Sequence, residues 1–154
     1  MALKKLLSLL GNKSTKNDKD FKNWVKITTG YFPKNVSLYQ QAFFHSSASA
    51  KKSGAKINNE RLEFLGDAIL GAIIADYLFQ IYPFKDEGFL TQLRSRIVNG
   101  QKLKELALKF GFNDFLRASL TKDEKTKSSA YGDAFEAFIG AVYLDMGYVK
   151  TKKF

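Results

Sequence analysis

The 154-residue sequence has no cysteine, two prolines, one tryptophan and a single histidine, His45. The absence of cysteine excludes disulfide scaffolds and thiolate zinc sites, and it fits the reducing cytoplasm, where we expect the protein. One histidine is too few for a carboxylate-bridged di-iron bundle, which needs a Glu-x-x-His pair on each of two helices. A metal site in this chain would therefore rest on oxygen ligands.

Long apolar runs and alternating strand patterns are also missing. No uninterrupted apolar run is long enough to span a bilayer, and no segment repeats with the period of two that half-buried strands require. Hydrophobic residues still make up 45% of the chain, which is enough for one well-cored domain. The sequence therefore predicts an all-α fold of about seven helices. Residues 1–20 lack a signal-peptide cleavage site, so we interpret them as a basic arm or docking helix.

Acidic residues are outnumbered by basic ones, 15 to 25, and the net charge is +10. Several of the acids are assigned to one site below, so the remaining surface is more basic than this total suggests. Such a surface is typical of a protein that binds a polyanion. Basicity alone does not distinguish RNA from DNA or from an anionic membrane.

The segment 59–82 is a predicted apolar helix that three carboxylates interrupt. At about 100° per residue, Glu60, Glu63 and Asp67 fall on one stripe, which continues into apolar residues. A helix that is apolar nearly all round is normally buried, and a carboxylate on it is costly unless a cation pairs with it. We therefore expect this helix and its acidic stripe to be shielded from water.

A second acidic helix is predicted over 131–145, where Asp133 and Glu136 are spaced to share one face. Small residues and the string Gly-Asp-Ala occur in both helices, which favours close packing of the two. The carboxylates would then converge, and oxygen ligands of this kind suit Mg²⁺, with Mn²⁺ as a substitute. A solvated face explains one such pair, but two pairs in apolar helices favour a metal site. The predicted metal ligands are Glu63, Asp67, Asp133 and Glu136.

The remaining helices are predicted from caps and breaks. One helix covers 21–28 and ends near Gly30, and a second runs from Ser37 to Ser49 with His45 inside it in a structural role. Asp86 caps a helix that directs four apolar side chains inward: Leu90, Leu93, Ile97 and Val98. Another helix over 99–110 is closed by Gly111.

Segment 60–68, ERLEFLGDA, resembles the signature of the ribonuclease III family of double-stranded-RNA endonucleases. Further matches follow in that family's order and approximate spacing, at 41–47, 86–88, 93–94, 103–110, 132–137 and 143–145. The nine-residue core is far more specific than a lone glycine motif. The resemblance covers residues 21–154, which it identifies as a nuclease domain. Bacterial members usually continue into a double-stranded-RNA-binding domain, which is absent from this chain, so we expect an isolated or truncated nuclease domain.

The resemblance implies a metal-dependent endoribonuclease that cuts double-stranded RNA and leaves 5′-phosphate and 3′-hydroxyl ends. Ribosomal and messenger RNA processing are the roles that it implies. Asp67 and Glu136 would be catalytic, with Glu60 and Glu87 as further acids beside the metal. A symmetric homodimer is also implied, in which Phe64 inserts into the other subunit; the alternative is an ordinary core phenylalanine. The alternative function is a non-catalytic RNA-binding relative, which would not need the four acids.

Five basic residues are candidate contacts to the RNA backbone: Lys122, Lys125, Lys127, Arg94 and Arg96. The lysines lie in the polar segment 119–129, for which a solvated loop is the ordinary explanation. One of the two arginines could instead neutralise the acidic cluster. Ser128 stands where some bacterial relatives carry an acid, so no role of that acid is expected here.

Overall fold

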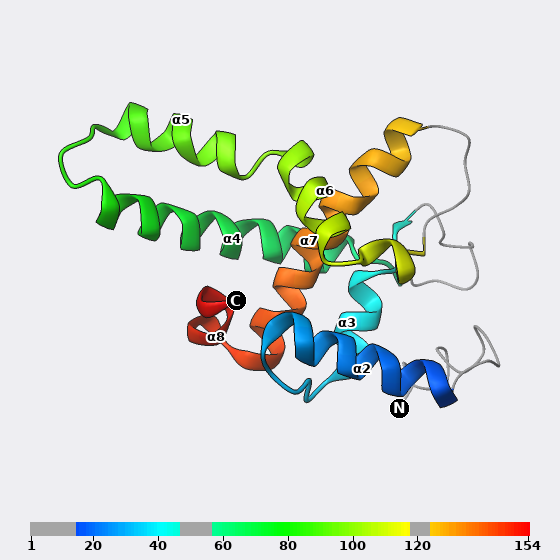
Figure 1. The fold of residues 1–154 in the computed structure, drawn as a ribbon. Helices are drawn as coiled ribbons and strands as arrows, with labels where there is room; N and C mark the ends of the chain where they lie inside the picture. The colour runs from blue at the N-terminus through cyan, green and yellow to red at the C-terminus, as the bar shows by residue number, and fades with distance from the viewer. Residues whose placement is uncertain (1–14, 47–56, 118–123) are drawn as a thin grey trace. The chain divides into compact units, whose positions relative to one another are not determined.

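The computed structural model describes residues 15–46, 57–117 and 124–154 (Figure 1). The described residues form seven α-helices and one short 3₁₀ helix, η2 (Phe112–Asp114), with no strand among them. This confirms the predicted all-α class. The α-helices are α2 (Thr15–Thr29), α3 (Val36–Ala42), α4 (Glu60–Ile81), α5 (Glu87–Ile97), α6 (Gly100–Lys109), α7 (Glu124–Met146) and α8 (Tyr148–Lys153).

The chain divides into two compact units, Met1–Lys34 and Asn35–Phe154. In the first unit, α2 begins at Thr15 and not at residue 21, so the helix is longer than predicted. Stacked rings of Phe21 and Trp24, with centroids 5.8 Å apart, lie on this helix. α2 ends as predicted at Gly30, whose φ of 76° is a left-handed conformation that suits glycine.

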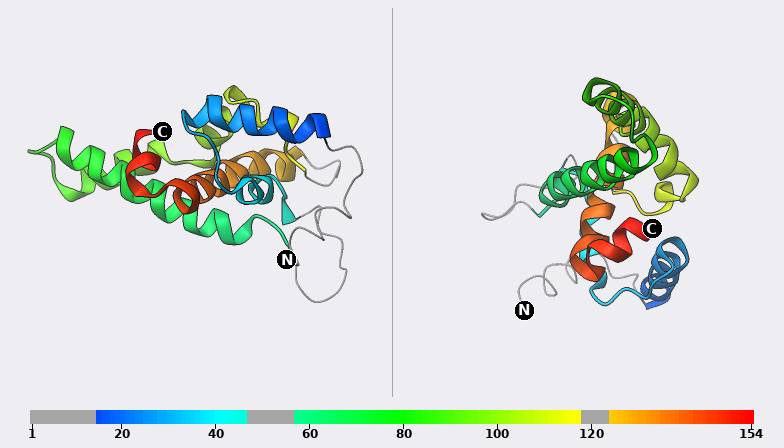
Figure 2. Two further views of the ribbon diagram at one scale, coloured as in Figure 1. Left: turned by 90° about the horizontal axis from the view of Figure 1, so that it is seen from below. Right: turned by 90° about the vertical axis from the view of Figure 1, so that its left-hand side faces the viewer.

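Helix α7 is the central element of the second unit. It contacts α3, α4, α6 and α8, and Figure 2 shows it, in orange, running between its neighbours. Its buried side chains are mostly alanine and phenylalanine: Ala130, Ala134, Phe135, Ala137, Phe138, Ile139, Ala141 and Val142. Alanines allow helix axes to approach, and the phenylalanines supply the buried area. The helix begins at Glu124, so part of the segment predicted as a loop is helical.

Helix α4 has the predicted bounds but not the predicted burial. Among its residues only Leu62, Gly66 and Leu78 are buried. Large apolar side chains are exposed along it, including Phe64 at 81% and Phe79 at 71%. By length and composition alone the helix could also cross a membrane, contrary to the expectation from its interrupted apolar runs. Within one chain, the expectation of a buried α4 is therefore wrong.

Helix α5 runs back alongside α4 and has no buried residue (Figure 1). The four apolar side chains that were predicted to point inward are all partly exposed: Leu90, Leu93, Ile97 and Val98. The predicted cap is confirmed, because the Phe89 amide donates to Asp86 Oδ1 at 2.8 Å. Beyond α6, Gly111 has the predicted left-handed conformation, with φ of 77°.

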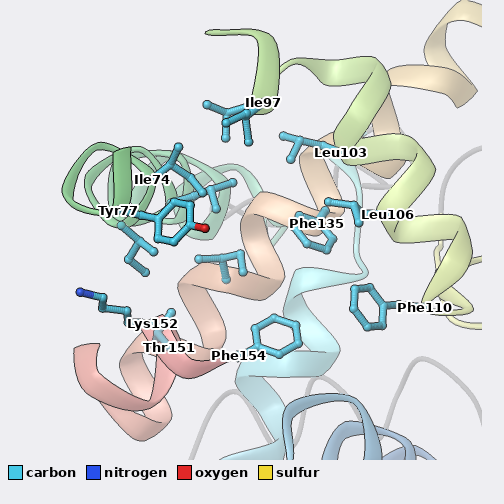
Figure 3. A pocket seen from close by; sticks show the side chains of 14 residues that line it. Ile74, Tyr77, Ile97, Leu103, Leu106, Phe110, Phe135, Thr151, Lys152 and Phe154 are labelled. Carbon is cyan, nitrogen blue, oxygen red and sulfur yellow. The ribbon is translucent and has the colours of Figure 1, made fainter. Parts of the chain in front are cut away.

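An apolar pocket with a volume of about 390 Å³ lies between α4, α6, α7 and α8 (Figure 3). Its walls include Ile74 and Tyr77 from α4, Leu106 from α6 and Phe135 from α7. At its rim Lys152 of α8 donates to a carboxylate oxygen of Asp76 on α4. The second unit therefore leaves an apolar hollow next to the side of α4 that carries Ile74 and Tyr77.

Candidate metal centre

The site is formed where α4 and α7 cross, and two glycines make this crossing unusually close. A Cβ atom placed on Gly66 would lie 1.7 Å from the backbone oxygen of Glu136. A Cβ atom on Gly140 would lie 2.4 Å from the backbone oxygen of Leu62. Both distances are far below van der Waals contact, so only glycine fits at either position. The backbones of the two helices touch, as the small residues in both had suggested.

Three carboxylates meet next to this crossing. Glu63 of α4 and Asp133 and Glu136 of α7 each present an oxygen, and these oxygens all lie within 4.8 Å of one another. All three side chains are half-buried. Glu63 and Glu136 lie close to the two glycines in sequence, which explains how side chains from separate helices reach one point. The structure thus brings together three of the four predicted ligands.

Asp67, the fourth predicted ligand, lies one turn beyond Glu63 and is exposed. It is outside the group of three, but its charge is the largest charge effect on the pKa of Glu136. Glu60, in the first turn of α4, is exposed as well. The expectation that the acidic stripe is shielded from water is therefore wrong for its two ends and holds in part for Glu63, because Glu60 and Asp67 are exposed in the part of the chain that the structure describes.

The carboxylates hold protons more tightly than usual. Burial, together with the charges of Asp67, Glu63 and Asp133, raises the pKa of Glu136 to about 7. Burial and the neighbouring carboxylates, Asp133 first, raise the pKa of Glu63. Burial also raises the pKa of Asp133, against an opposing effect of His45. Mutual repulsion in a partly buried site is relieved by a cation, so this cluster favours the binding of one.

His45 is a part of the site that sequence reasoning missed. It is buried, at 8% exposure, and its Nε2 atom lies 3.4 Å from Asp133 Oδ2. The helix predicted from Ser37 is present, but its predicted end at Ser49 is wrong, because α3 ends at Ala42 and the backbone before His45 pairs with Arg117 instead. Part of the predicted helix, 47–49, lies outside the described residues. The only signal in the sequence was that His45 is the single histidine, and it did not indicate a partner.

Phe64 directly follows Glu63, a predicted ligand, and is 81% exposed. This exposure rules out the alternative of an ordinary core phenylalanine. Glu87 lies in the first turn of α5, where it accepts a hydrogen bond of 2.7 Å from the Thr91 hydroxyl. It is not among the charges that raise the pKa of Glu63, Asp133 or Glu136.

The predicted RNA-contacting residues are described only in part. Arg94 and Arg96 lie in the last turn of α5 and are exposed, and in the described ranges no ion pair joins either to the acidic cluster. Lys122 lies outside the described residues. Lys125, Lys127 and Ser128 lie at the start of α7, but their side chains are outside the description.

The donor set decides which cation fits. The site offers carboxylate oxygens from two helices, whereas the sequence contains no cysteine and the one nearby histidine contacts a carboxylate. Oxygen ligands around a partly open site suit a hard divalent cation that keeps several water molecules. Glu63, Asp133 and Glu136, with Asp67 one turn away, therefore fit the metal centre predicted from the sequence.

Known proteins match this chain over most of its length. Residues 35–154 match the family described as Ribonuclease-III-like. Ribonuclease 3 of Bacteroides fragilis is 48% identical over 126 residues, which are 81% of this chain and 43% of the relative. Ribonuclease 3 of Zunongwangia profunda is 41% identical over 148 residues, which are 96% of this chain and 60% of the relative. The chain thus spans less than half the length of the first of these relatives.

Solved structures agree with the sequence matches. The nuclease domain of ribonuclease III from Campylobacter jejuni is 34% identical, with a TM-score of 0.73 over 84% of this chain and 90% of that domain. That structure is described as flexible in a region involved in dimer formation. Dicer from Pichia stipitis is 31% identical, with a TM-score of 0.58 over 77% of this chain and 50% of Dicer. With the helical fold, the acidic centre and these matches together, the chain belongs to the ribonuclease III family.

Proposed function

We propose that this chain is the catalytic part of a metal-dependent endoribonuclease that hydrolyses phosphodiester bonds of double-stranded RNA. The observation that carries the proposal is the meeting of Glu63, Asp133 and Glu136 within 4.8 Å at a backbone crossing of two helices. Family membership supports the same activity. The nuclease domain that we propose covers residues 21–154, and the family match supports the part from residue 35.

The four acids would share the catalytic work. A divalent cation bound at this site, Mg²⁺ or Mn²⁺, would supply Lewis-acid activation of water and of the scissile phosphate. Glu63, Asp133 and Glu136 would hold it through carboxylate oxygens, with exposed Asp67 completing the set on the solvent side. Asp67 and Glu136 are the residues that we propose as catalytic. Attack of water on phosphorus with departure of the 3′ oxygen leaves a 5′-phosphate and a 3′-hydroxyl.

We also propose that the active form is a symmetric homodimer whose interface contains α4. This helix exposes several large apolar side chains, including Phe64 at 81% and Phe79 at 71%, and such surfaces typically mark an interaction site. A second copy is a better cover than a membrane, because Glu63 and Asp67 lie on the same helix and charged side chains are costly in lipid. In a symmetric dimer each centre could cut one strand of a duplex.

The basic character of the chain supports an RNA partner. The net charge is +10 although acidic residues gather in the site, so the rest of the surface carries a large excess of positive charge. Duplex RNA would be recognised by its A-form shape and its 2′-hydroxyls rather than by base sequence. Binding by this chain alone should therefore be strongly salt-dependent and nearly indifferent to sequence. Arg94 and Arg96 are exposed candidates for phosphate contacts.

One cleavage experiment tests the proposal. The protein is incubated with a long RNA duplex in Mg²⁺, in Mn²⁺ and in chelator, with single-stranded RNA and duplex DNA of the same sequence as controls. We expect short duplex products only in the metal-containing reactions with duplex RNA, and end-labelling should find 5′-phosphates. Binding of duplex RNA without any cleavage in Mg²⁺ or Mn²⁺ would instead support the alternative, a non-catalytic RNA-binding relative.

A further inference from the structure

Backbone hydrogen bonds join residues 43–45, the segment that includes His45, to Arg117 and to Asn59. The Arg117 amide donates to the Phe43 carbonyl at 2.8 Å, and the His45 amide donates to the Arg117 carbonyl at 3.1 Å. Between them, the Asn59 amide donates to the Phe44 carbonyl at 2.9 Å. We call these three bonds the backbone clamp. They fix the main chain at His45, so its ring has a defined starting position.

The same clamp is attached to the helix that carries Glu63. Asn59 precedes α4, is fully buried, and donates through Nδ2 to the Ala42 carbonyl at 3.3 Å. Gln41 adds a bond of 2.9 Å from Nε2 to the Asn58 carbonyl. The main chain that leads to His45 and the start of α4 are thus held against each other. These bonds fix the backbone at His45 relative to the start of α4, and burial of the side chain limits the positions that its ring can take.

From this position the His45 side chain reaches α7. Its Nε2 atom lies 3.4 Å from Asp133 Oδ2, and only 8% of the residue is exposed. An aspartate side chain can turn about two bonds, so its oxygens do not face a neighbouring cation unless something restrains them. An N–H on His45 Nε2 that donates to Oδ2 would be such a restraint, and the 3.4 Å separation places the two atoms for this contact. The other oxygen of Asp133 would then be left for a cation.

We infer that His45 is a positioning residue, which orients Asp133 so that this carboxylate can bind the divalent cation. The inference rests on the proposed function, because it assumes that Asp133 is a metal ligand. His45 would act through Asp133 and would not touch the cation or the RNA. Groups that orient a ligating carboxylate typically contribute 10- to 100-fold to metal affinity.

Two substitutions that differ by one methylene test this inference. In His45→Gln the side-chain amide nitrogen can take the place of Nε2, whereas in His45→Asn it is one bond too short to do so. Isothermal titration with Mg²⁺ gives the metal affinity of the wild type and of both variants. Duplex-RNA binding in chelator is measured in parallel, because a merely structural defect would weaken it too.

We expect His45→Asn to weaken Mg²⁺ binding about tenfold or more. His45→Gln should stay within about threefold of the wild type, and RNA binding in chelator should be unchanged for both. Equal Mg²⁺ affinity of His45→Asn and the wild type would overturn the inference. So would equal weakening by both variants. If His45→Asn does not fold, His45→Gln alone tests the inference. Its amide can donate to Asp133 as His45 does, so a tenfold loss of Mg²⁺ affinity in this variant would contradict the positioning role.

The wild type separates this inference from the proposed function. A wild-type chain that neither binds Mg²⁺ nor cuts duplex RNA contradicts the proposed function itself. A wild type that does both, together with a His45→Asn variant that binds Mg²⁺ equally well, contradicts only the role of His45.

Discussion

Helices α4 and α7 are alike in sequence and different in their surroundings. They contain 22 and 23 residues, both include Gly-Asp-Ala, and each supplies carboxylates to the acidic centre. α7 is buried along most of its second half, whereas only three residues of α4 are buried. Apolar composition therefore indicates that a helix packs against other apolar residues, but not whether those residues come from the same chain. For α7 the cover is its own domain, and for α4 we propose a second copy.

Among the predictions, the largest effect should come from neutralising Glu136, the half-buried carboxylate on α7. Glu136→Gln on α7 should lower cleavage of duplex RNA about a thousandfold, roughly 4 kcal/mol, because the site loses a ligand charge without a change of shape. The matched variant is Glu60→Gln on α4, where the side chain is exposed and the loss should be much smaller. Single-turnover cleavage rates measure both. Equal losses would contradict the distinction between the two carboxylates.

The glycine crossing should give the next largest effect. Gly66→Ala should destabilise the fold by about 3 kcal/mol, because the new Cβ would overlap the Glu136 carbonyl and push α4 away from α7. Gly71→Ala on the same helix is the control, since a Cβ there meets nothing within 4 Å. It should be neutral or slightly stabilising through higher helix propensity. Urea unfolding of the two variants compares them, and a stable Gly66→Ala variant would contradict the close crossing.

The exposed face of α4 is tested by association. Phe64→Ala should weaken the proposed dimer by about 2 kcal/mol and leave the fold of each chain intact, as expected for an aromatic anchor at an interface. Phe84→Ala is the control, because this phenylalanine is also exposed, at 98%, but lies beyond the end of α4. Sedimentation equilibrium measures the dissociation constants. A wild type that stays monomeric at micromolar concentration contradicts the dimer.

The smallest effect concerns pH. Since the pKa of Glu136 is raised from 4.5 to about 7, the folded metal-free protein keeps a proton there that the unfolded chain releases. The contribution of Glu136 to the free energy of unfolding is therefore fully present below about pH 4.5 and is lost as the pH rises toward 7. Glu136→Gln cannot titrate at this position, so we expect its free energy of unfolding to fall by about 1 kcal/mol less than that of the wild type over this pH range. This value is small because the side chain is half exposed and solvent screens its charge.

Melting curves in chelator, recorded at several pH values for the wild type and Glu136→Gln, measure this difference. With Mg²⁺ present, the stabilisation of the wild type should grow as pH rises, because the cation competes with the proton for the carboxylate. Identical pH profiles of the two proteins in chelator would show that Glu136 titrates normally.

Local signals in the sequence predicted much of the fold. Asp86 caps α5 and Gly111 closes α6, because capping and left-handed glycine depend on residues close in sequence. The acidic pair of α7 was also visible, since a spacing of three residues places Asp133 and Glu136 on one helical face. Both kinds of prediction succeed because the feature depends only on residues that are close together in the sequence.

Long-range contacts explain what the sequence did not reveal. α3 ends at Ala42 because the chain beyond it pairs with Arg117, a partner far away in sequence. The contact of His45 with Asp133 depends on that pairing, so it could not be predicted from periodicity. The exposure of α4 was missed for a similar reason, since a helix pattern does not reveal which molecule covers it.

The glycine crossing also limits how this protein can change over time. A Cβ on Gly66 meets the Glu136 backbone, and a Cβ on Gly140 meets the backbone of Leu62, so neither clash involves a side chain. A second substitution cannot remove a backbone atom. Screens for suppressors of Gly66→Ala should therefore return reversions, or changes elsewhere that raise general stability, and no compensating partner on α7. The spacing of the acids that we propose as metal ligands thus depends on two positions at which only glycine fits.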